Sequence, residues 1–340
     1  MYNVAIVGCG YWGPNLIRNF NSLERCTVRA ICDVSETRLA HMKTLYPAAA
    51  TTTDFEGLIN DPEIHAIAIA TPVNTHFKLA EKSLNAGKHT LIEKPMAASV
   101  EECLKLKELA EKKKLTLMVG HTFLYSQPVR RIKEIVKQGD LGDSLYYISA
   151  RRLNLGLFQR DINVTWDLAP HDISIILYVM EATPISVNCQ GKAHVNKGIE
   201  DITNMTINFN NGGFATVKSS WLDPNKIREM TFVGSKRMLV YNDLEPNEKV
   251  KVYDKRVETP PHYDTFAEFH HAYHYGDMYS PYIKQDEPLK IECQHFLDCI
   301  ESGATPLTGA GESLRVVQVL EAASQSLKNG GNKVEIENKF

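Results

Sequence analysis

Short apolar runs alternate with helical segments over the first third of the chain. The runs span residues 4–7, 28–32, 66–70, 89–92 and 116–119, and the helical segments span 14–21, 35–46, 75–85 and 99–114. Strands that are apolar throughout and separated by helices are typical of a parallel sheet with helices on both faces. We therefore expect an α/β domain built on a parallel sheet over residues 1–121.

The pattern changes from about residue 122. Helical patterns at 126–138, 166–180, 288–302 and 311–328 accompany strand patterns at 145–153, 185–189, 204–209, 214–220, 230–233, 237–241 and 250–253. The turn Asn210-Asn211-Gly212-Gly213 joins two of these strands as a hairpin. Residues 122–340 are therefore expected to form an α+β domain on an open, mostly antiparallel sheet.

Bulk properties exclude several classes of partner. The formal net charge is -3, from 38 basic and 41 acidic residues, which gives no reason to expect nucleic acid. No apolar run approaches the roughly 18 residues that span a bilayer, so no membrane partner is expected, and the start resembles a strand rather than a signal peptide. The seven cysteines are scattered without a C-x-x-C pair, so we expect a cytoplasmic protein without a disulfide framework.

A glycine-rich motif follows the first apolar run. Gly8-Cys9-Gly10-Tyr11-Trp12-Gly13 is G-x-G-x-x-G between a strand and a helix, the context in which this motif holds a dinucleotide pyrophosphate at the helix N-terminus. Asp33 ends the second strand, 20 residues after Gly13, where an acid receives the adenosine ribose hydroxyls. Such a carboxylate favours NAD over NADP, although Arg38 lies nearby. The alternative is a glycine turn in an unrelated α/β domain, with Asp33 capping the next helix.

Further candidates lie where the later strands end, because ligands of parallel sheets bind beyond the carboxyl ends of the strands. The run after residue 69 contains Thr71, Pro72, Asn74 and His76. It can equally be a proline turn with Asn74 or Thr75 as a helix cap, and His76 fits a first-turn helix residue better than a catalyst. The next strand ends in Glu93-Lys94-Pro95, which suggests a site beside the nicotinamide.

Several segments resemble the glucose–fructose oxidoreductase / inositol dehydrogenase / rhizopine catabolism (Gfo/Idh/MocA) family. The matching segments are Gly8-Cys9-Gly10-Tyr11-Trp12-Gly13, Ala70-Thr71-Pro72-Val73-Asn74-Thr75-His76, Ala86-Gly87-Lys88-His89 before Glu93-Lys94-Pro95, and Asp167-Leu168-Ala169-Pro170-His171-Asp172-Ile173. The resemblance implies an NAD-dependent oxidoreductase with a Rossmann domain, no metal, and a homodimer or homotetramer. It assigns catalysis to Lys94, Asp167 and His171. The cofactor contacts are then expected at Gly8, Gly10, Tyr11, Trp12, Gly13, Asp33, Arg38, Thr71, Pro72, Asn74, His76, Glu93 and Lys94.

The implied chemistry is coherent by itself. Oxidising a secondary alcohol needs a hydride acceptor and a base, and imidazole titrates near neutral pH. Asp167 and His171 are four residues apart, so both project from one helix face. Lys94 can donate to the reacting oxygen. The alternative is that Asp167 is an N-cap, His171 a buried helix residue and Lys94 a surface residue, and Pro170 leaves the helix start open.

The substrate is less constrained. Arg151, Arg152 and Asn154 follow a strand, and Trp221, Lys226 and Arg228 flank a turn; they are candidates for sugar and phosphate binding or a solvated rim of charges. The blocks 11–15 and 166–172 resemble family members of nucleotide-sugar biosynthesis, which implies oxidation at C3 of a UDP-N-acetylhexosamine or its uronate. An inositol or free-sugar dehydrogenase, a 3-keto sugar reductase and a non-catalytic NAD-binding regulator are the alternatives.

The segment 262–282 is rich in His and Tyr. His270 and His274 have the spacing of a zinc pair, but no third ligand stands out, so we expect a polar substrate loop or a subunit contact rather than a metal site. The other members are His262, His271, Tyr263, Tyr273, Tyr275, Tyr279 and Tyr282.

Overall fold

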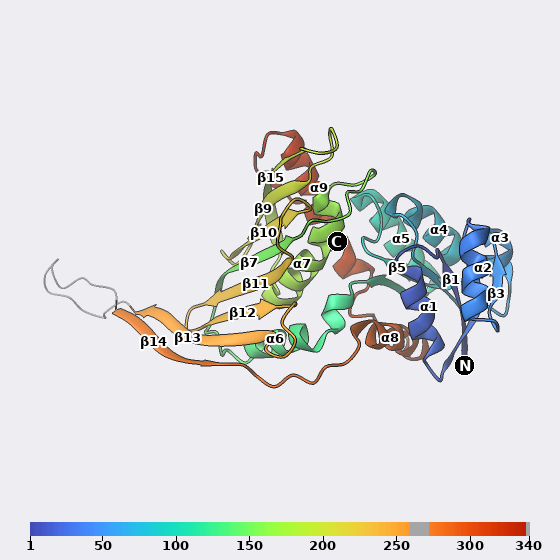
Figure 1. Cartoon of the computed structure of the whole chain (residues 1–340), viewed down its shortest axis with the longest axis horizontal. Helices are drawn as coiled ribbons and strands as arrows, with labels where there is room; N and C mark the ends of the chain where they lie inside the picture. Colours follow the sequence, from blue (N-terminus) through green and yellow to red (C-terminus); the bar gives the residue numbers. More distant parts are fainter. Residues whose placement is uncertain (259–271, 338–340) are drawn as a thin grey trace, which may run out of the picture. The chain divides into compact units, whose positions relative to one another are not determined.

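A computed structural model describes residues 1–258 and 272–337 (Figure 1). Contacts within the chain separate two compact units. The first holds residues 1–126 and 286–321, and the second holds the remaining described residues. Residues 286–321 are predicted to belong to the second domain, with all of 122–340, whereas their contacts place them with the first unit. In the described part of the chain, no helix is long and apolar enough to cross a membrane.

The first unit is built on a six-stranded sheet of order β3-β2-β1-β4-β5-β6, counted over the described residues. All its pairs are parallel, which confirms the predicted Rossmann-type sheet. The strand order reverses between β1 and β4, the position at which such sheets bind dinucleotides. Its elements are β1 Tyr2–Val7, α1 Gly13–Asn21, β2 Cys26–Cys32, α2 Glu36–Leu45, β3 Ala50–Thr52, α3 Phe55–Asn60, β4 Ala66–Ile69, α4 Val73–Asn85, β5 His89–Glu93, α5 Val100–Lys113, β6 Leu117–Gly120, the 3-10 helix η1 Thr122–Tyr125, α8 Pro288–Ser302 and the first part of α9 Ala310–Lys328.

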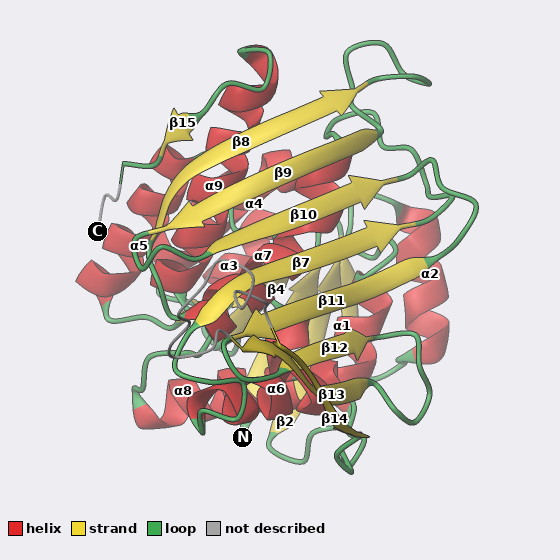
Figure 2. Cartoon of the chain, turned by 90° about the vertical axis from the view of Figure 1, so that its left-hand side faces the viewer, coloured by secondary structure: helices red, strands yellow, loops and turns green. Residues whose placement is uncertain are grey.

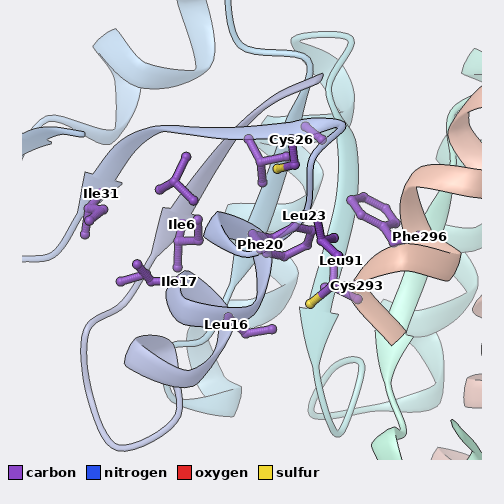
Figure 3. Packing of buried hydrophobic residues seen from close by; sticks show 14 of the residues in the cluster. Ile6, Leu16, Ile17, Phe20, Leu23, Cys26, Ile31, Leu91, Cys293 and Phe296 are labelled. Carbon is purple, nitrogen blue, oxygen red and sulfur yellow. The ribbon is translucent and has the colours of Figure 1, made fainter. Parts of the chain in front are cut away.

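Helix α8 belongs to this unit because it covers the outer face of α1. The rings of Phe20 and Phe296 meet edge to face with centroids 6.3 Å apart, and Cys293 is buried in the same cluster (Figure 3). Glu287, just before α8, forms an ion pair with Arg18 of α1 at 2.5 Å. Burying two apolar helix faces against each other removes a few hundred Å² of surface from water, at about 25 cal/mol per Å². A segment far away in the sequence therefore completes the core of the first unit.

The second unit is built on a nine-stranded sheet of order β14-β13-β12-β11-β7-β10-β9-β8-β15, counted over the described residues (Figure 2). Among the strands that the structure describes, only the pair β10–β7 is parallel, so the predicted mostly antiparallel sheet is confirmed. Helix α7 packs on β7, β9 and β10, and α6 packs on α7. The elements are α6 Gln127–Lys137, β7 Leu145–Leu153, α7 Val164–Met180, β8 Pro184–Lys192, β9 Ile202–Phe209, β10 Phe214–Ser220, β11 Ile227–Gly234, β12 Met238–Asn242, β13 Val250–Glu258, β14 Ala272–Tyr279 and β15 Val334–Glu335.

The two faces of this sheet differ, as alternation along a strand requires. On β7, Ile148, Ala150 and Arg152 are buried, and Arg152 binds Asp172 of α7, so these residues face the helix. Ser149 and Arg151 lie on the opposite face, where a hollow of about 490 Å³ is lined mostly by polar residues of β7, β8, β9 and β10. Residues on one strand thus divide between two different environments.

Candidate cofactor and catalytic sites

The glycine-rich loop between β1 and α1 is shaped by its glycines. Gly8 has φ +97°, and a Cβ there would lie 2.5 Å from the carbonyl oxygen of Ala70. A Cβ at Gly13 would lie 1.9 Å from the Gly8 oxygen, so α1 can approach the strand only without a side chain. Gly10 is different, because a Cβ there would meet nothing within 4 Å. The fold does not require glycine at position 10, whereas the close approach of a pyrophosphate does.

Asp33 ties the glycine loop to the start of α2. Its buried carboxylate accepts the backbone N–H of Cys9 at 2.5 Å and that of Ser35 at 2.8 Å. Ser35 is the N-cap of α2, so the alternative in which Asp33 caps this helix is wrong. The Arg38 guanidinium lies 3.8 Å from Asp33. Beside them a hollow of about 390 Å³ is lined by Cys9, Gly10, Pro14, Thr37, Arg38, His41, Met42 and Leu45.

The loops after β4 and β5 are held together by His76. Its buried ring places one nitrogen 2.8 Å from the Pro95 carbonyl oxygen and the other 2.8 Å from that of Thr71. Helix α4 begins after Pro72, so Asn74 and Thr75 are helical residues and the alternative in which either caps the helix is wrong. Asn74 is exposed. His76 therefore acts on the protein's own loops, and both of its ring nitrogens are engaged there.

A buried polar cluster lies at the carboxyl ends of β5 and β6. Glu93 pairs in register with Gly120, and its carboxyl group lies over that glycine. Burial raises the pKa of Glu93 to about 7, against the lowering effect of the Lys94 charge. Glu292 of α8 accepts a hydrogen bond from the Thr122 hydroxyl at 2.7 Å. Burial, and then the Glu93 charge, raise the pKa of Glu292 well above its ordinary value. A buried carboxyl group avoids the cost of desolvating its charge by keeping its proton.

His121 follows β6 directly, as Glu93 ends the neighbouring strand β5. It is buried, and burial followed by the Lys94 charge lowers its pKa to about 3, so the ring is neutral. In the described part of the chain, neither of its ring nitrogens has a hydrogen-bond partner. Buried polar groups normally have partners, so His121 offers a donor and an acceptor to a ligand. The nicotinamide carboxamide of a dinucleotide needs one hydrogen-bond donor and one acceptor. His121, Gly10 and the hollow beside α2 therefore fit such a cofactor.

In the second unit, α7 carries the two candidate catalytic residues. Asn163 is its N-cap and accepts the backbone N–H of Trp166 at 3.2 Å, so the alternative in which Asp167 is the N-cap is wrong. Asp167 lies in the first turn and His171 one turn later, as the spacing predicts. Pro170 lies inside α7, because the helix begins at Val164 rather than Trp166 as expected. The Asp167 carboxylate accepts the indole N–H of Trp221 at 2.9 Å.

The structure separates the residues predicted to bind substrate. Arg152 is buried in a two-bond pair with Asp172, at 3.0 and 2.7 Å, and Arg151 lies on the opposite face of the sheet, bound to Glu229. Arg228 pairs in register with Arg152, so it shares the α7 face and lies 3.4 Å from Asp243. Lys226 is exposed in the β10–β11 turn, and Asn154 follows β7 with its backbone N–H bound to Ser220. The structure therefore brings Arg228, but not Arg151, to the side of helix α7, which carries the candidate catalytic residues.

The His- and Tyr-rich segment is only partly described. His262, Tyr263, His270 and His271 lie outside the described residues, and so does the predicted pair of His270 with His274. Residues 272–279 form the edge strand β14 rather than the expected loop, and His274 binds Asp254 at 3.0 Å. Over the residues that the structure describes, no group of three or more His, Cys, Asp or Glu side chains could hold a metal ion.

Both units match models of one family. Residues 2–121 match the oxidoreductase family with an NAD-binding Rossmann fold, and residues 129–240 match the GFO/IDH/MocA C-terminal domain. The chain belongs to the Gfo/Idh/MocA family. It is an NAD-binding oxidoreductase that acts on CH–OH groups.

Relatives in the Gfo/Idh/MocA family differ in substrate. The chain is 25% identical to the uncharacterised oxidoreductase YrbE of Bacillus subtilis, over 96% of this chain and 94% of that protein. It is 30% identical to the UDP-N-acetylglucosamine 3-dehydrogenase of Acidithiobacillus ferrooxidans, over 58% of this chain and 61% of that protein. The solved structure named as that dehydrogenase superposes with a TM-score of 0.79 at 22% identity, covering 97% of this chain and 99% of that one. GenD2 of gentamicin A biosynthesis, solved with NAD, gives 0.83 at 19% identity, covering 99% and 96%. At these identities the superpositions show the fold alone.

Two polar residues of this Gfo/Idh/MocA protein, His121 and Glu292, were not predicted from the sequence, and a third, Trp221, was predicted with a different contact. His121 could have been found by the rule that singled out Lys94, because it too follows a buried parallel strand. Glu292 carried no signal, since it lies within an ordinary helical pattern of a distant segment. Trp221 was singled out as a substrate contact, but it is 1% exposed and bonded to Asp167.

Proposed function

We propose that the protein oxidises the C3 hydroxyl of a UDP-N-acetylhexosamine, or of its uronate, to a ketone. The observation that carries the proposal is the pair Asp167 and His171 on one face of α7, in a chain whose other unit binds NAD and carries Lys94 at the end of β5. An imidazole base and a nearby carboxylate are what removal of a hydroxyl proton needs. The same residues would serve a 3-keto sugar reductase in the reverse direction.

Each residue has a defined part in this reaction. NAD, when bound, accepts the hydride that leaves the carbinol carbon. His171 takes the hydroxyl proton, and Asp167 orients the imidazole or binds a neighbouring sugar hydroxyl. Lys94 donates to the reacting oxygen and stabilises its developing negative charge. One carbon–hydrogen bond and one oxygen–hydrogen bond break, and the products are a ketone, reduced cofactor and a proton.

The cofactor contacts follow from the loops of the first unit. Gly8, Gly10 and Gly13 give the pyrophosphate access to the N-terminus of α1, with Tyr11 and Trp12 in the same loop. Arg38 lines the hollow beside α2 and lies 3.8 Å from Asp33, so we expect the adenosine half there. Thr71 and Pro72 follow β4, Asn74 lies in the first turn of α4, and Glu93 and Lys94 lie at the end of β5, where we expect the nicotinamide half. His76 holds the two loops in place.

The nucleotide part of the substrate is assigned to the α7 face of the second unit. Arg228 and Lys226 are cations there, and Asn154 follows β7; diphosphate recognition uses such donors. We expect Arg228→Ala to raise KM for the UDP-sugar about tenfold, the effect of losing one charge-assisted hydrogen bond, with little change in KM for NAD. Arg131→Ala is the control, because Arg131 is a half-exposed residue of α6 whose ion pair is with Glu134 of the same helix. Equal KM values for the UDP-sugar in Arg228→Ala and wild type would show that Arg228 does not bind the substrate.

A free polyol is the second candidate substrate. The chain is 24% identical to the scyllo-inositol 2-dehydrogenase of Bacillus subtilis over 80% of its length. An assay of the purified protein with NAD separates the two candidate substrates. Each member of a panel of UDP-sugars and polyols is added, and the absorbance of the reduced nicotinamide is read. A 2-keto acid acceptor belongs in the assay in case the cofactor stays bound. Turnover of polyols without turnover of UDP-sugars would replace the proposed substrate.

We also propose a cytoplasmic homodimer or homotetramer. All seven cysteines are free and buried, as suits a reducing compartment. The open face of the nine-stranded sheet carries stacked Tyr147 and Phe214, and a second copy could cover it. Light scattering after size exclusion gives the oligomeric state, and a monomer at micromolar concentration would contradict it.

A further inference from the structure

Trp221 is the largest fully buried side chain in the described part of the chain. It follows β10, and its backbone is fixed on both sides: its N–H donates to the Asp201 oxygen and its oxygen accepts the Gly156 N–H, each at 2.9 Å. The Phe158 ring packs edge-on at 5.7 Å, and a Cβ at Gly156 would lie 2.9 Å from the indole. The indole is thus enclosed, and it cannot change orientation without moving this loop.

The indole has one polar atom, and that atom donates a hydrogen bond to Asp167. Indole Nε1–H is a donor only, and it lies 2.9 Å from Oδ2 of the Asp167 carboxylate. A hydrogen bond to an ionised acceptor is about twice as strong as one between neutral groups. With an exposed fraction of 1%, Trp221 has no surface left for a sugar. Its contact is with the carboxylate and not with a substrate.

A second anchor fixes the same helix five residues later. Asp172, next to His171, forms a buried two-bond pair with Arg152 of β7. This anchor fixes α7 on the sheet. The indole acts on the Asp167 carboxylate itself, because a donor on a rigid ring favours one position for Oδ2.

We propose that Trp221 is a positioning residue, which fixes the Asp167 carboxylate for its work beside His171. The inference rests on the proposed function, in which Asp167 orients the base or binds a substrate hydroxyl. Catalytic groups lose much of their effect when displaced by about 1 Å, so a fixed carboxylate matters more for kcat than for NAD binding.

The test compares two tryptophans that each donate one indole hydrogen bond. Trp221→Phe removes the donor to Asp167, and Trp166→Phe removes the donor to Ser324 at 2.8 Å in the same unit. We expect Trp221→Phe to lower kcat about 10- to 100-fold, as loss of a bond to a charged group does, with the Kd for NAD unchanged. Trp166→Phe should change kcat less than about threefold. Equal kcat values for the two variants would overturn the proposal.

A double-mutant cycle separates positioning from a general structural effect. If Trp221 acts through Asp167, Trp221→Phe should cost little further activity in an Asp167→Asn background. Additive losses would overturn the inference. An Asp167→Asn variant as active as wild type would instead refute the proposed role of Asp167, so the two failures are distinguishable.

A measurement on the wild-type side chain covers the case in which Trp221→Phe does not fold. The chain has three tryptophans, so ¹⁵N-tryptophan labelling gives three indole N–H signals. Asp167→Ala should move one of them and speed its exchange with solvent, while the signals of Trp12 and Trp166 stay in place. Three unchanged signals would show that the contact does not exist in solution and would overturn the proposal.

Discussion

Several polar side chains of the first unit are buried, and burial determines whether they carry a charge. Glu292 is the clearest case, because its carboxyl group is fully buried beside Glu93 and bonded only to the Thr122 hydroxyl in the described part of the chain. The raised pKa means that the folded protein keeps a proton on Glu292 that the unfolded chain releases above about pH 4.5. The unfolded chain therefore binds fewer protons than the folded one, and the free energy of unfolding falls as pH rises through this range.

We expect Glu292→Gln to remove this pH dependence. Glutamine keeps the acceptor for Thr122 and has no proton to lose. The free energy of unfolding of the variant, relative to that of wild type, should therefore rise by more than about 1 kcal/mol from about pH 5 to pH 8. Urea unfolding of both proteins at several pH values measures this difference in the free energy of unfolding. Glu24→Gln, an exposed glutamate before β2, is the control and should give curves parallel to wild type. Parallel curves for Glu292→Gln would mean that Glu292 is ionised in the folded protein.

At the scale of elements, helix α5 ends with a residue in an unfavourable conformation. Lys114 has φ 56° and ψ 40°, the left-handed region in which glycine is favoured. Lys114→Gly should stabilise the protein by about 0.5–1 kcal/mol, because the strain of a side chain there is relieved. Lys112→Gly, inside the same helix, should destabilise it by about 1 kcal/mol. Thermal unfolding of both variants checks the pair, and a Lys114→Gly variant less stable than wild type would contradict the expected strain.

Elements with a clear period were predictable, and short or exposed ones were not. Strand β7 and helix α8 have the bounds that the sequence predicts, since each carries an unbroken pattern. Strand β3, with three residues, and α3, with six, are too short to show a period. Strand β14 was missed because it is an edge strand without a buried face, so its apolar residues do not form the pattern of a half-buried strand.

At the scale of the whole molecule, the sequence could not show that residues 286–321 return to the first unit. That placement depends on the outer face of α1, more than 250 residues earlier in the chain, and on pairs such as Phe20 with Phe296. The candidate site was more predictable than this topology. Gly8, Gly13, Asp33 and Lys94 lie at strand ends that the pattern had already located. The partner of Asp167, Trp221, lies 54 residues later and follows a strand, and the pairing of Arg152 with Asp172 joins a strand to helix α7; no local pattern shows either contact.

The central claim is that His171 removes a hydroxyl proton while NAD accepts the hydride. A single-turnover experiment tests it: protein with NAD is mixed with a UDP-N-acetylhexosamine, and reduced nicotinamide is followed by absorbance in wild type and in His171→Ala. We expect the variant to bind NAD as wild type does but to form reduced cofactor about 10²- to 10⁴-fold more slowly, the usual contribution of a general base. Reduced cofactor formed by His171→Ala at the wild-type rate would contradict the account.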